Sequence, residues 1–555
     1  MTDQLVYQGN VTNETTSDPQ NQEWNASRKA YQMCIEKLNS LQPLTRELPE
    51  AGVITRSTDV TRVKSMVQYL TRCGVSMEDI NRIPIIHVAG TKGKGSVCVF
   101  SESVLRKYGL KTGLFTSPHL IEVRERFPID GKPIDYNKFV RYFSEVFYKL
   151  EDSKEEFGQE MPVYKQILCV MGFYVFLKEK VDVAVIEVGL GGQYDVTNFI
   201  REPIVTGISS LGLDHVELLG NTIAEIAWHK AGILKPGKPA FTVPRPEDAM
   251  KVILDRAKEI GTTVQCVPSF EIYDLGKHPL KLGIPGKYQQ ANASLVIQLC
   301  RKFLETTKNT NDAFRGLREC YWPGRSQRVV RDRVTYYLDG AHTERSIKCC
   351  VEWFVEVTRE EEARTNGRTA KMLVFNLKSQ KYKPSLIRPL LNCGFTGAAF
   401  CPSYINDGEN PADQSFLANK RHEEFCNSQN IKQKYEDLDA VLRKSFFDGR
   451  NTNKFQSLQV AEKGFSDPES SKFSFRDHAK PTKCVALPSI SAALRWASAG
   501  KDALLDLANI QDSEILGECL VVDRIQVLIT GSLYLVGGAL QLLDPKLATG
   551  IMSYK

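Results

Sequence analysis

The sequence predicts an α/β protein, with a doubly wound parallel-sheet domain followed by a smaller Rossmann-like α/β domain. Short, continuously apolar runs alternate with helical segments from about residue 83 onward. A second series of such runs begins after about residue 328. Apolar runs of this length suit strands that are buried on both faces of a parallel sheet. A chain of 555 residues is too long for one ordinary domain, so two domains with insertions are expected.

The expected strands of the first domain are the runs IPIIHVAG, TGLFTS, VDVAVIEVG, PIVTGISS and KPAFTV. Helical segments such as SVCVFSESVLRKYG and TIAEIAWHKAG separate them. The second of these helices opens with Thr222 and Glu225, which have the T-x-x-E spacing of a capping box. In the second domain the expected strands are VTYYLDG, KMLVFN, TGAAFC and QVLITG.

Composition sets the expected boundaries. Residues 1–25 are polar and are expected to form a disordered tail. Helical patterning dominates 28–75, so we expect the first domain to cover 26–321 and the second 322–555. Inside the second domain, 402–480 is rich in Asn, Ser, Lys, Asp and Glu. It indicates a polar insertion with some helix, in KQKYEDLDAVLRKSF.

Bulk composition excludes several classes of protein. The chain is 42% hydrophobic and 25% charged, which is typical of globular proteins. Its formal net charge of +6 is small for this length and does not indicate a nucleic-acid partner. The 14 cysteines include no C-x-x-C pair, so we expect reduced core thiols and no structural zinc site.

The termini give no targeting or membrane signal. No Lys or Arg precedes Arg28, whereas a secretory signal needs a basic start and a mitochondrial transit peptide is Arg-rich. A cytoplasmic location is therefore predicted. The late apolar stretch VLITGSLYLVGGALQLL is interrupted by glycines and is shorter than about 20 residues. It predicts a buried strand and helix, and no membrane span.

The strongest local motif is HVAGTKGKGS, residues 87–96, where a strand runs through a glycine-rich turn into a helix. Backbone N–H groups of such a turn can cradle phosphate oxygens, and Lys94 would add a positive charge. The motif departs from a strict Walker A sequence because Gly95 separates Lys94 from Ser96. A glycine-rich turn alone is often just a turn, but the strand before it and Lys-Gly-Ser after it favour phosphate binding. The first domain is thus expected to be a P-loop ATPase domain.

Polar residues follow the next strands of the predicted sheet. Glu187 ends the strand in VDVAVIEVG and is placed to hold Mg²⁺ at the edge where ligands of open parallel sheets bind. The alternative is a capping or salt-bridged Glu. His215, in SSLGLDH, could reach the same metal or its waters, with Asp214 behind it. Lone histidines are more often structural, and Lys230, late in its helix, is structural by position alone.

In the second domain, Arg325 in YWPGRSQ could bind phosphate through its planar guanidinium. Asp339 and His342, in YYLDGAHT, come just after a strand, and Asp339 could accept from a ribose hydroxyl. Each could equally take part in an interdomain ion pair.

Taken together, these motifs resemble the folylpolyglutamate synthase family in its eukaryotic form, a branch of the Mur ligase superfamily. The resemblance is carried by GTKGKGS, LKTGLFTSPHL followed by VRERFPIDGKPI, IEVGLGGQYDVTN, LGLDHVELLGNTIAEIAWHKAGILKPGKPAFTV, WPGR, LDGAHT and ITGSLYLVGG. The motifs keep their order and spread from about residue 60 to 540, which is far more specific than one glycine loop.

The resemblance implies a role for each of a set of positions. The residues expected to contact ATP are Lys92, Gly93, Lys94, Gly95, Ser96, Asn292, Arg325, Asp339 and His342. The expected metal ligands are Thr116, Glu187 and His215, and the expected catalytic residues are Lys94, Lys230 and His215. The residues expected to border the folate are Ser117, Pro118, His119 and Arg124. The expected cofactors are ATP and two Mg²⁺ ions; the resemblance also allows a carbamate on Lys230 and a K⁺ ion.

The implied activity is the ATP-dependent addition of L-glutamate to the γ-carboxylate of a reduced folate, through an acyl phosphate, by a monomeric enzyme with no nucleic-acid partner. Three alternatives stay open: a dihydrofolate synthase or bifunctional enzyme on the same fold, a P-loop regulatory protein without ligase activity, and an inactive binding protein. A mitochondrial pool is also compatible with the resemblance.

The sequence departs from the family pattern at several places. FNLKSQKYKP replaces a T-G-x-R-like run, so no role is transferred there. Tyr534 stands where His is usual, and His229 where Gln or Asn precedes the lysine. Thr116 stands where Ser is also common, and it keeps the hydroxyl. None of these changes removes an expected phosphate or metal ligand.

Overall fold

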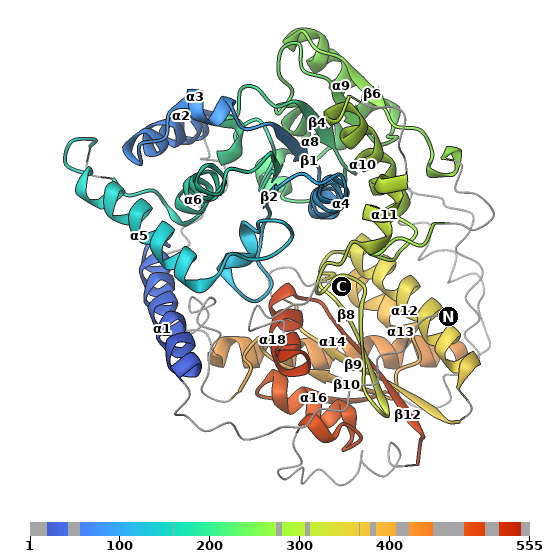
Figure 1. The fold of residues 1–555 in the computed structure, drawn as a ribbon. Coiled ribbons are helices and arrows are strands. Elements are labelled where there is room, and N and C mark those ends of the chain that lie inside the picture. The colour runs from blue at the N-terminus through green and yellow to red at the C-terminus, as the bar shows by residue number, and fades with distance from the viewer. Residues whose placement is uncertain are drawn as a thin grey trace. The chain divides into compact units, whose positions relative to one another are not determined.

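The structure is a computed structural model and describes residues 19–42, 56–158, 160–273, 280–305, 311–365, 367–377, 384–406, 421–447, 482–505 and 521–545. The chain divides into two compact units, with the boundary between Trp322 and Pro323. We call them the N-terminal unit and the C-terminal unit, and each is described by itself (Figure 1).

The N-terminal unit is built on a parallel sheet with strand order β2-β3-β1-β4-β5-β6. The strands of this sheet are β1 (Ile85–Ala89), β2 (Thr112–Phe115), β3 (Val183–Glu187), β4 (Val205–Ile208), β5 (Ala240–Thr242) and β6 (Val264–Cys266). The first five are the predicted apolar runs, and all of their residues are buried. Strand β6 was not predicted, because its three residues are partly exposed and carry no apolar run.

Two apolar cores cover the two faces of this sheet, which confirms the doubly wound prediction. Ile85 and Ile186 belong to one core, whereas their chain neighbours Ile86 and Val185 belong to the other. Because successive side chains of a strand point to opposite faces, the two cores lie on opposite sides. The first core takes residues from α1 (Pro19–Ser40), α2 (Arg56–Arg72), α3 (Met77–Asn81), α5 (Tyr136–Asp152) and α6 (Tyr164–Glu179). The second takes residues from α4 (Lys94–Lys107), α10 (Gln289–Phe303) and α11 (Asn311–Glu319).

The remaining elements of the N-terminal unit are short or lie beside β5 and β6. They are η1 (Val123–Arg126), η2 (Val196–Phe199), α7 (Val216–Leu219), α8 (Ile223–Ala231), α9 (Glu247–Ile260) and η3 (Phe270–Ile272). Helix α8 begins at the predicted capping box, since the Thr222 side chain accepts from the N–H of Glu225 and the Glu225 carboxylate accepts from the N–H of Thr222.

Helix α1 corrects the prediction of a disordered tail up to residue 25. The helix already begins at Pro19, and residues 1–18 lie outside the described part of the chain. Trp24 packs edge-on against Tyr136, with ring centroids 6.5 Å apart, and Tyr31 packs against Phe139 at 4.8 Å. These contacts with α5 order a segment whose composition is polar, because one face carries aromatic side chains.

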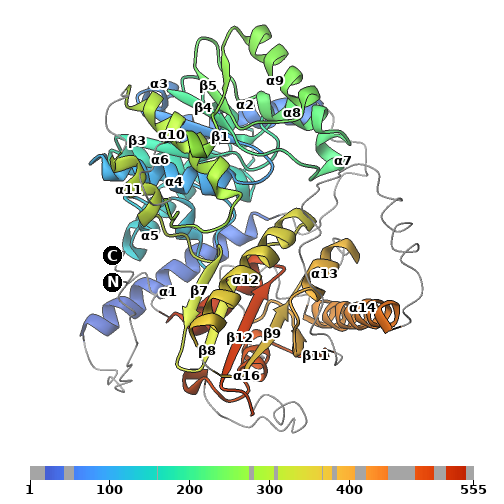
Figure 2. The ribbon, with the colours of Figure 1, turned by 90° about the vertical axis from the view of Figure 1, so that its right-hand side faces the viewer.

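The C-terminal unit holds a second six-stranded sheet, with order β11-β10-β9-β12-β8-β7 (Figure 2). The strands of this sheet are β7 (Gln327–Val330), β8 (Val334–Asp339), β9 (Thr369–Phe375), β10 (Gly397–Phe400), β11 (Lys483–Ala486) and β12 (Arg524–Thr530). All pairs are parallel except β7 with β8. The four predicted strands are β8, β9, β10 and β12. Strands β7 and β11 were not predicted, since both lie at the sheet edges and are only partly buried.

Helices cover both faces of this sheet too. One core holds residues from α12 (Glu344–Arg364), α13 (Pro384–Leu391) and α14 (Arg421–Phe447). The opposite face is met by α16 (Ile490–Ser498) and α18 (Leu533–Leu543), and η7 (Ala503–Leu505) follows α16. The late apolar stretch forms β12 and α18, as predicted, and among the described residues no helix is long and apolar enough to cross a membrane.

The predicted polar insertion, 402–480, is partly an element of the core. Its helix α14 buries Ile431 and Tyr435, and Tyr435 lies against Phe400 of β10 with ring centroids 5.5 Å apart. The prediction of helix in this stretch is confirmed. The segments 407–420 and 448–480 lie outside the described residues.

Candidate active site

The predicted phosphate loop connects β1 to α4 in the N-terminal unit. Gly93 caps the helix with φ of 86°, a left-handed conformation that glycine adopts without strain. The first helical hydrogen bond runs from the N–H of Val97 to the carbonyl of Gly93, at 2.8 Å. Within the described residues, the N–H groups of Gly93, Lys94, Gly95 and Ser96 donate to no protein acceptor. Four such N–H groups at a helix N-terminus are suited to bind an anion.

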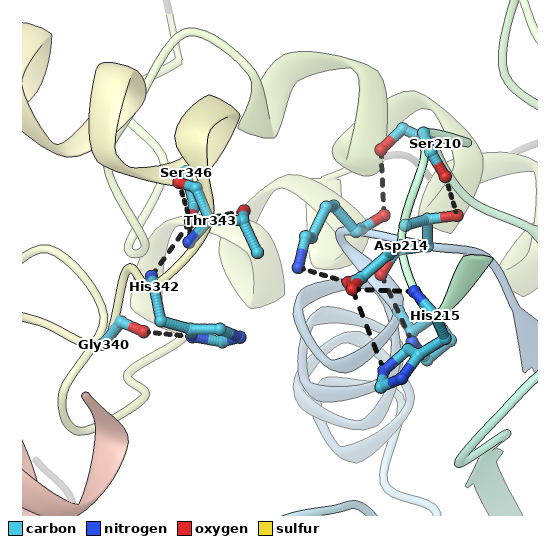
Figure 3. Close-up of polar contacts among 11 residues, drawn as sticks. Ser210, Asp214, His215, Gly340, His342, Thr343 and Ser346 are labelled. Carbon is cyan, nitrogen blue, oxygen red and sulfur yellow. Dashed lines mark hydrogen bonds and ion pairs between the residues drawn. The ribbon is translucent and has the colours of Figure 1, made fainter. Parts of the chain in front are cut away.

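The loop that follows β4 holds the phosphate loop in place. The carbonyl of Ser210 accepts from the N–H groups of Thr91 and Lys92, at 2.8 and 3.2 Å. In return, the hydroxyls of Ser209 and Ser210 donate to the carbonyl of Lys92, at 2.9 and 3.0 Å (Figure 3). These bonds occupy the backbone polar groups of Thr91 and Lys92 at the start of the phosphate loop. The N–H groups of 93–96, in its second half, stay available to a ligand. The serine pair was missed from the sequence, where it resembled an ordinary strand end.

Two close approaches explain the glycines at positions 93 and 95. A Cβ at position 93 would lie 2.4 Å from Oδ1 of Asn292, and a Cβ at position 95 would lie 2.1 Å from Cη2 of Trp322. Asn292 also donates to Gln289, whose side chain donates to the hydroxyl of Ser96. Helix α10 and Trp322 therefore fix the phosphate loop from two sides. Asn292 was predicted to contact ATP, and it lies against this loop; the role of Trp322 was not foreseen.

The carboxyl ends of β2 and β3 bring Thr116, Ser117 and Glu187 together. The two strands are neighbours, with Phe115 opposite Ile186. Oε2 of Glu187 accepts from the N–H of Ser117 at 2.9 Å. Thr116 and Glu187 are both buried. Strand β3 also pairs with β1, so this cluster lies at the sheet edge from which the phosphate loop emerges.

His215 and Asp214 lie in the loop after β4, on the other side of β1. Oδ2 of Asp214 lies 2.9 Å from Nζ of Lys92, which forms an ion pair beside the phosphate loop (Figure 3). His215 begins α7 with a left-handed φ of 52°, an uncommon conformation for a residue with a Cβ. Its side chain is 50% exposed, with Nε2 3.9 Å from Oδ1 of Asp214.

Lys230 is the least expected feature of this edge, because position alone indicated a solvated lysine. It is buried near the end of α8. The pKa of its ammonium is lowered from 10.5 to about 7, chiefly by burial and also by the charge of Lys94, while Asp195 and Asp214 act in the opposite direction. A lysine in this state supplies a substantial fraction of neutral amine near neutral pH.

The donor set at the sheet edge fits Mg²⁺. Within the described residues, no group of three or more His, Cys, Asp and Glu side chains could hold a metal alone. Mg²⁺ in nucleotide sites is held by one or two protein carboxylates, waters and phosphate oxygens, without a complete protein cage. The buried Glu187, whose carboxylate accepts from the residue after Thr116, matches that pattern at the sheet edge that also carries the candidate phosphate loop.

The segment predicted to border the folate, Ser117 to His119, continues from Thr116. Its Ser117–Pro118 peptide bond is cis. Nδ1 of His119 accepts from Nε of Arg126 at 3.0 Å, which places the imidazole proton of a neutral His119 on Nε2.

Arg124 is placed differently from the other predicted folate residues. Its buried guanidinium pairs with Glu122, donates to the carbonyl of Ile134 at 2.6 Å and lies 3.8 Å from the ring centroid of Tyr136. These contacts give Arg124 a structural role, and a direct bond to substrate stays a prediction.

Three further predicted residues lie in the C-terminal unit. Asp339 is buried and accepts from the N–H groups of Ser326 and Ala341, both at 2.9 Å. Burial raises its pKa, and the nearby Arg325 acts in the opposite direction. Nδ1 of His342 lies 2.8 Å from the carbonyl of Gly340 (Figure 3). The turn after β8 thus gathers Arg325, Asp339 and His342.

Two of the departures from the family pattern, His229 and Tyr534, lie at helix ends, whereas residues 378–383 of the FNLKSQKYKP run lie outside the described residues. The ring of His229 packs against Trp228 and Tyr194, with centroids 5.1 and 5.9 Å away. The N–H of Tyr534 donates to the hydroxyl of Ser532 at the start of α18, at 3.2 Å.

A P-loop-like turn, a buried carboxylate beside it and a buried lysine, all on a doubly wound sheet followed by a second α/β unit, define an ATP-dependent ligase of the Mur ligase type. Comparisons with known proteins agree. The chain is 38% identical to the mitochondrial folylpolyglutamate synthase of Homo sapiens, across 93% of this chain and 92% of that protein. It is 34% identical to the folylpolyglutamate synthase of Neurospora crassa, across 94% and 92%. The chain belongs to the folylpolyglutamate synthase family.

Solved structures support the same fold. The Mycobacterium tuberculosis folylpolyglutamate synthase complexed with ADP matches 93% of this chain and 99% of its own, with a TM-score of 0.62 and 21% identity. An FPGS–AMPPCP–folate complex matches 71% of this chain and 94% of its own, with a TM-score of 0.55 and 25% identity. No protein-family model matches the chain. The predicted family, fold class and ligase activity are confirmed.

Proposed function

We propose that this chain adds L-glutamate to the γ-carboxylate of a reduced folate by way of an acyl phosphate. A γ-carboxylate oxygen attacks the γ-phosphorus of ATP, the new O–P bond forms, and ADP leaves. The amino nitrogen of glutamate then attacks the carbonyl carbon, the C–O bond to phosphate breaks, and the amine loses a proton. ATP is needed because a free carboxylate repels nucleophiles. The observation that carries the proposal is the set of N–H groups at 93–96 that have no protein acceptor among the described residues. They follow β1, the strand that pairs with the strand ending at Glu187.

The residues of the phosphate loop would bind the triphosphate. The N–H groups of 93–96 and the ammonium of Lys94 offset its negative charge. Lys92 is paired with Asp214 and would join the phosphates by exchanging that partner. In the C-terminal unit, we assign Arg325, Asp339 and His342 to the nucleotide as well.

Mg²⁺ would be held by Glu187, the hydroxyl of Thr116 and His215, with phosphate oxygens and waters completing its coordination. When bound, the metal offsets the repulsion between the two anionic reactants. His215 is half-exposed and well placed for an outer position, as a direct ligand or through a water. The second Mg²⁺ and the K⁺ ion of the resemblance remain proposals without a distinct site among the described residues.

Lys230 is proposed to work as a carbamate. Its lowered pKa leaves neutral amine available, and a neutral amine captures CO₂ to give an anion with oxygen ligands. The Lys230→Ala variant, assayed with and without added acetate or bicarbonate, tests this. We expect loss of activity and partial rescue by the added anion. Wild-type activity without any addition would remove Lys230 from the mechanism.

Ser117, Pro118 and His119 are assigned to the folate side, because they continue from Thr116 next to Glu187. His119 would present its Nε2–H as a donor. We also propose a monomer whose two domains cover 26–321 and 322–555. A cytoplasmic location is proposed as well, and a mitochondrial pool is added because three of the relatives are named as mitochondrial enzymes.

The proposal is tested by incubating the full chain with ATP, L-glutamate and tetrahydrofolate, and resolving the products by mass. We expect successive additions of glutamate residues and ADP formation that requires both glutamate and folate. A parallel reaction with dihydropteroate separates a dihydrofolate synthase, and product there alone would overturn the proposal. ADP formation that ignores glutamate would indicate a regulatory nucleotide-binding protein.

A further inference from the structure

One partly buried glutamate in the N-terminal unit, Glu125, has three backbone donors and no part in the mechanism above. Oε2 of Glu125 accepts from the N–H of Leu120 at 2.8 Å, and Oε1 accepts from the N–H groups of Ile121 and Glu122 at 2.9 and 2.8 Å. These three N–H groups follow directly after the segment assigned to folate, 117–119. A single side chain therefore fixes the backbone at the end of that segment.

The other end of the loop is closed by backbone bonds to β2. The N–H of Leu114 donates to the carbonyl of Pro128, and the N–H of Thr116 donates to that of Arg126, both at 3.1 Å. The chain thus leaves the sheet at Thr116, returns beside it at Arg126, and encloses Glu125. Arg126 also donates to His119. The position of the segment 117–119 therefore depends on Glu125, which lies inside the loop between Thr116 and Arg126.

We propose that Glu125 is a positioning residue for the folate acceptor: it sets the place of Ser117 and His119 through the backbone of 120–122 and never touches the substrate. This inference rests on the proposed function, which assigns the segment 117–119 to folate.

The pKa of Glu125 indicates that its role is to position the backbone and not to stabilise the fold. Burial raises the pKa of Glu125 to about 7, even though the three N–H groups act to lower it. When the pKa of a carboxyl group is raised in the folded state, its ionised form destabilises the folded state relative to the unfolded chain. The neighbouring charge of Glu122 raises the pKa as well, and Glu122 is paired with Arg124. The presence of this carboxylate is therefore better explained by the backbone of 120–122 that it holds in place than by a contribution to the free energy of folding.

The Glu125→Gln variant tests this with little change of shape. The amide oxygen of the new glutamine can replace Oε1 and accept from the N–H groups of Ile121 and Glu122. Its NH₂ group would face the N–H of Leu120, and two donors cannot form a hydrogen bond with each other. We expect faster amide hydrogen exchange in the peptide spanning 117–126 and a KM for tetrahydrofolate raised about tenfold, since a hydrogen bond to a charged group is lost. The KM for ATP and the melting temperature should be unchanged. The Glu125→Ala variant, which loses all three acceptor contacts, should raise the folate KM further.

Glu361→Gln in the C-terminal unit is the matched control, because the Glu361 carboxylate accepts from Thr335, Tyr337 and Gln526 and has no part in the proposed mechanism. It should leave exchange at 117–126 and the folate KM unchanged. An unchanged folate KM in Glu125→Gln, with faster exchange, would overturn the inference. Equal rises of both KM values with a lower melting temperature would also overturn it, because they indicate a purely structural residue. Failure of the proposed function appears separately, as wild-type enzyme that forms no glutamylated folate.

Discussion

Oε2 of Glu187 accepts a hydrogen bond from the backbone N–H of Ser117 at 2.9 Å, and this bond joins the carboxyl ends of β3 and β2. It fixes one carboxylate oxygen against the segment assigned to folate. The same strand, β3, pairs with β1, which leads into the phosphate loop. One buried side chain therefore links the proposed acceptor site with the proposed site for the triphosphate.

The Glu187→Gln variant should keep the fold and lose most of the rate. An amide can still accept from Ser117, but it cannot supply the negative charge that a metal ligand needs. We expect kcat to fall on the order of a thousandfold, with an unchanged circular dichroism spectrum and melting profile. A fall of tenfold or less would show that Glu187 has only a structural role.

Lys230→Met should stabilise the protein in a pH-dependent way. The folded-state pKa of Lys230 is lowered to about 7 from 10.5. Below pH 7 both states hold the proton, and the folded state bears the full penalty of a buried charge. As the pH rises from 7 towards 10.5, only the unfolded chain keeps the proton, and the penalty disappears.

The variant should therefore exceed the wild type in melting temperature at pH 6.5, and this excess should shrink by pH 9.5, both measured in CO₂-free buffer. Lys302→Met, at an exposed position of α10, is the control and should show no such trend. An excess that grows with pH would contradict the burial of a neutral amine at this position.

Gly95→Ala should destabilise the protein through Trp322. The added Cβ would lie 2.1 Å from Cη2 of that ring, and overpacking of this kind destabilises folding by about 1–3 kcal/mol. The Trp322→Leu change makes room for it. In denaturant unfolding, the double variant should be more stable than the sum of the single effects by on the order of 1 kcal/mol. Additive effects would mean that the ring does not limit position 95.

The strands of both sheets could be predicted where they are buried, because a central parallel strand must be apolar along its whole length. The edge strands β6, β7 and β11 could not, since partly exposed residues carry no such pattern. The tail prediction was wrong from Pro19 onward because the aromatic face of α1 packs on α5. The polar composition of the first residues of α1 gave no sign that the helix packs against α5.

The site was predictable to the extent that motifs mark strand ends. The turn at 93–96, Thr116 and Glu187 lie on one sheet edge, as their order along the strands implied. The burial of Lys230 and the inward position of Arg124 could not be predicted, because both depend on contacts with segments distant in sequence. The same holds for Glu125, whose three donors lie in an irregular loop that has no periodic pattern.

The central claim is that a carboxylate is activated by phosphorylation at this edge, and an isotope measurement tests it most directly. A folate acceptor with both γ-carboxylate oxygens labelled with ¹⁸O is incubated with the full chain, ATP and L-glutamate. The released inorganic phosphate is then analysed by mass. We expect one labelled oxygen in each phosphate, because the bridging oxygen of the acyl phosphate leaves with phosphorus when the amine attacks. Unlabelled phosphate alongside glutamylated product would contradict the account.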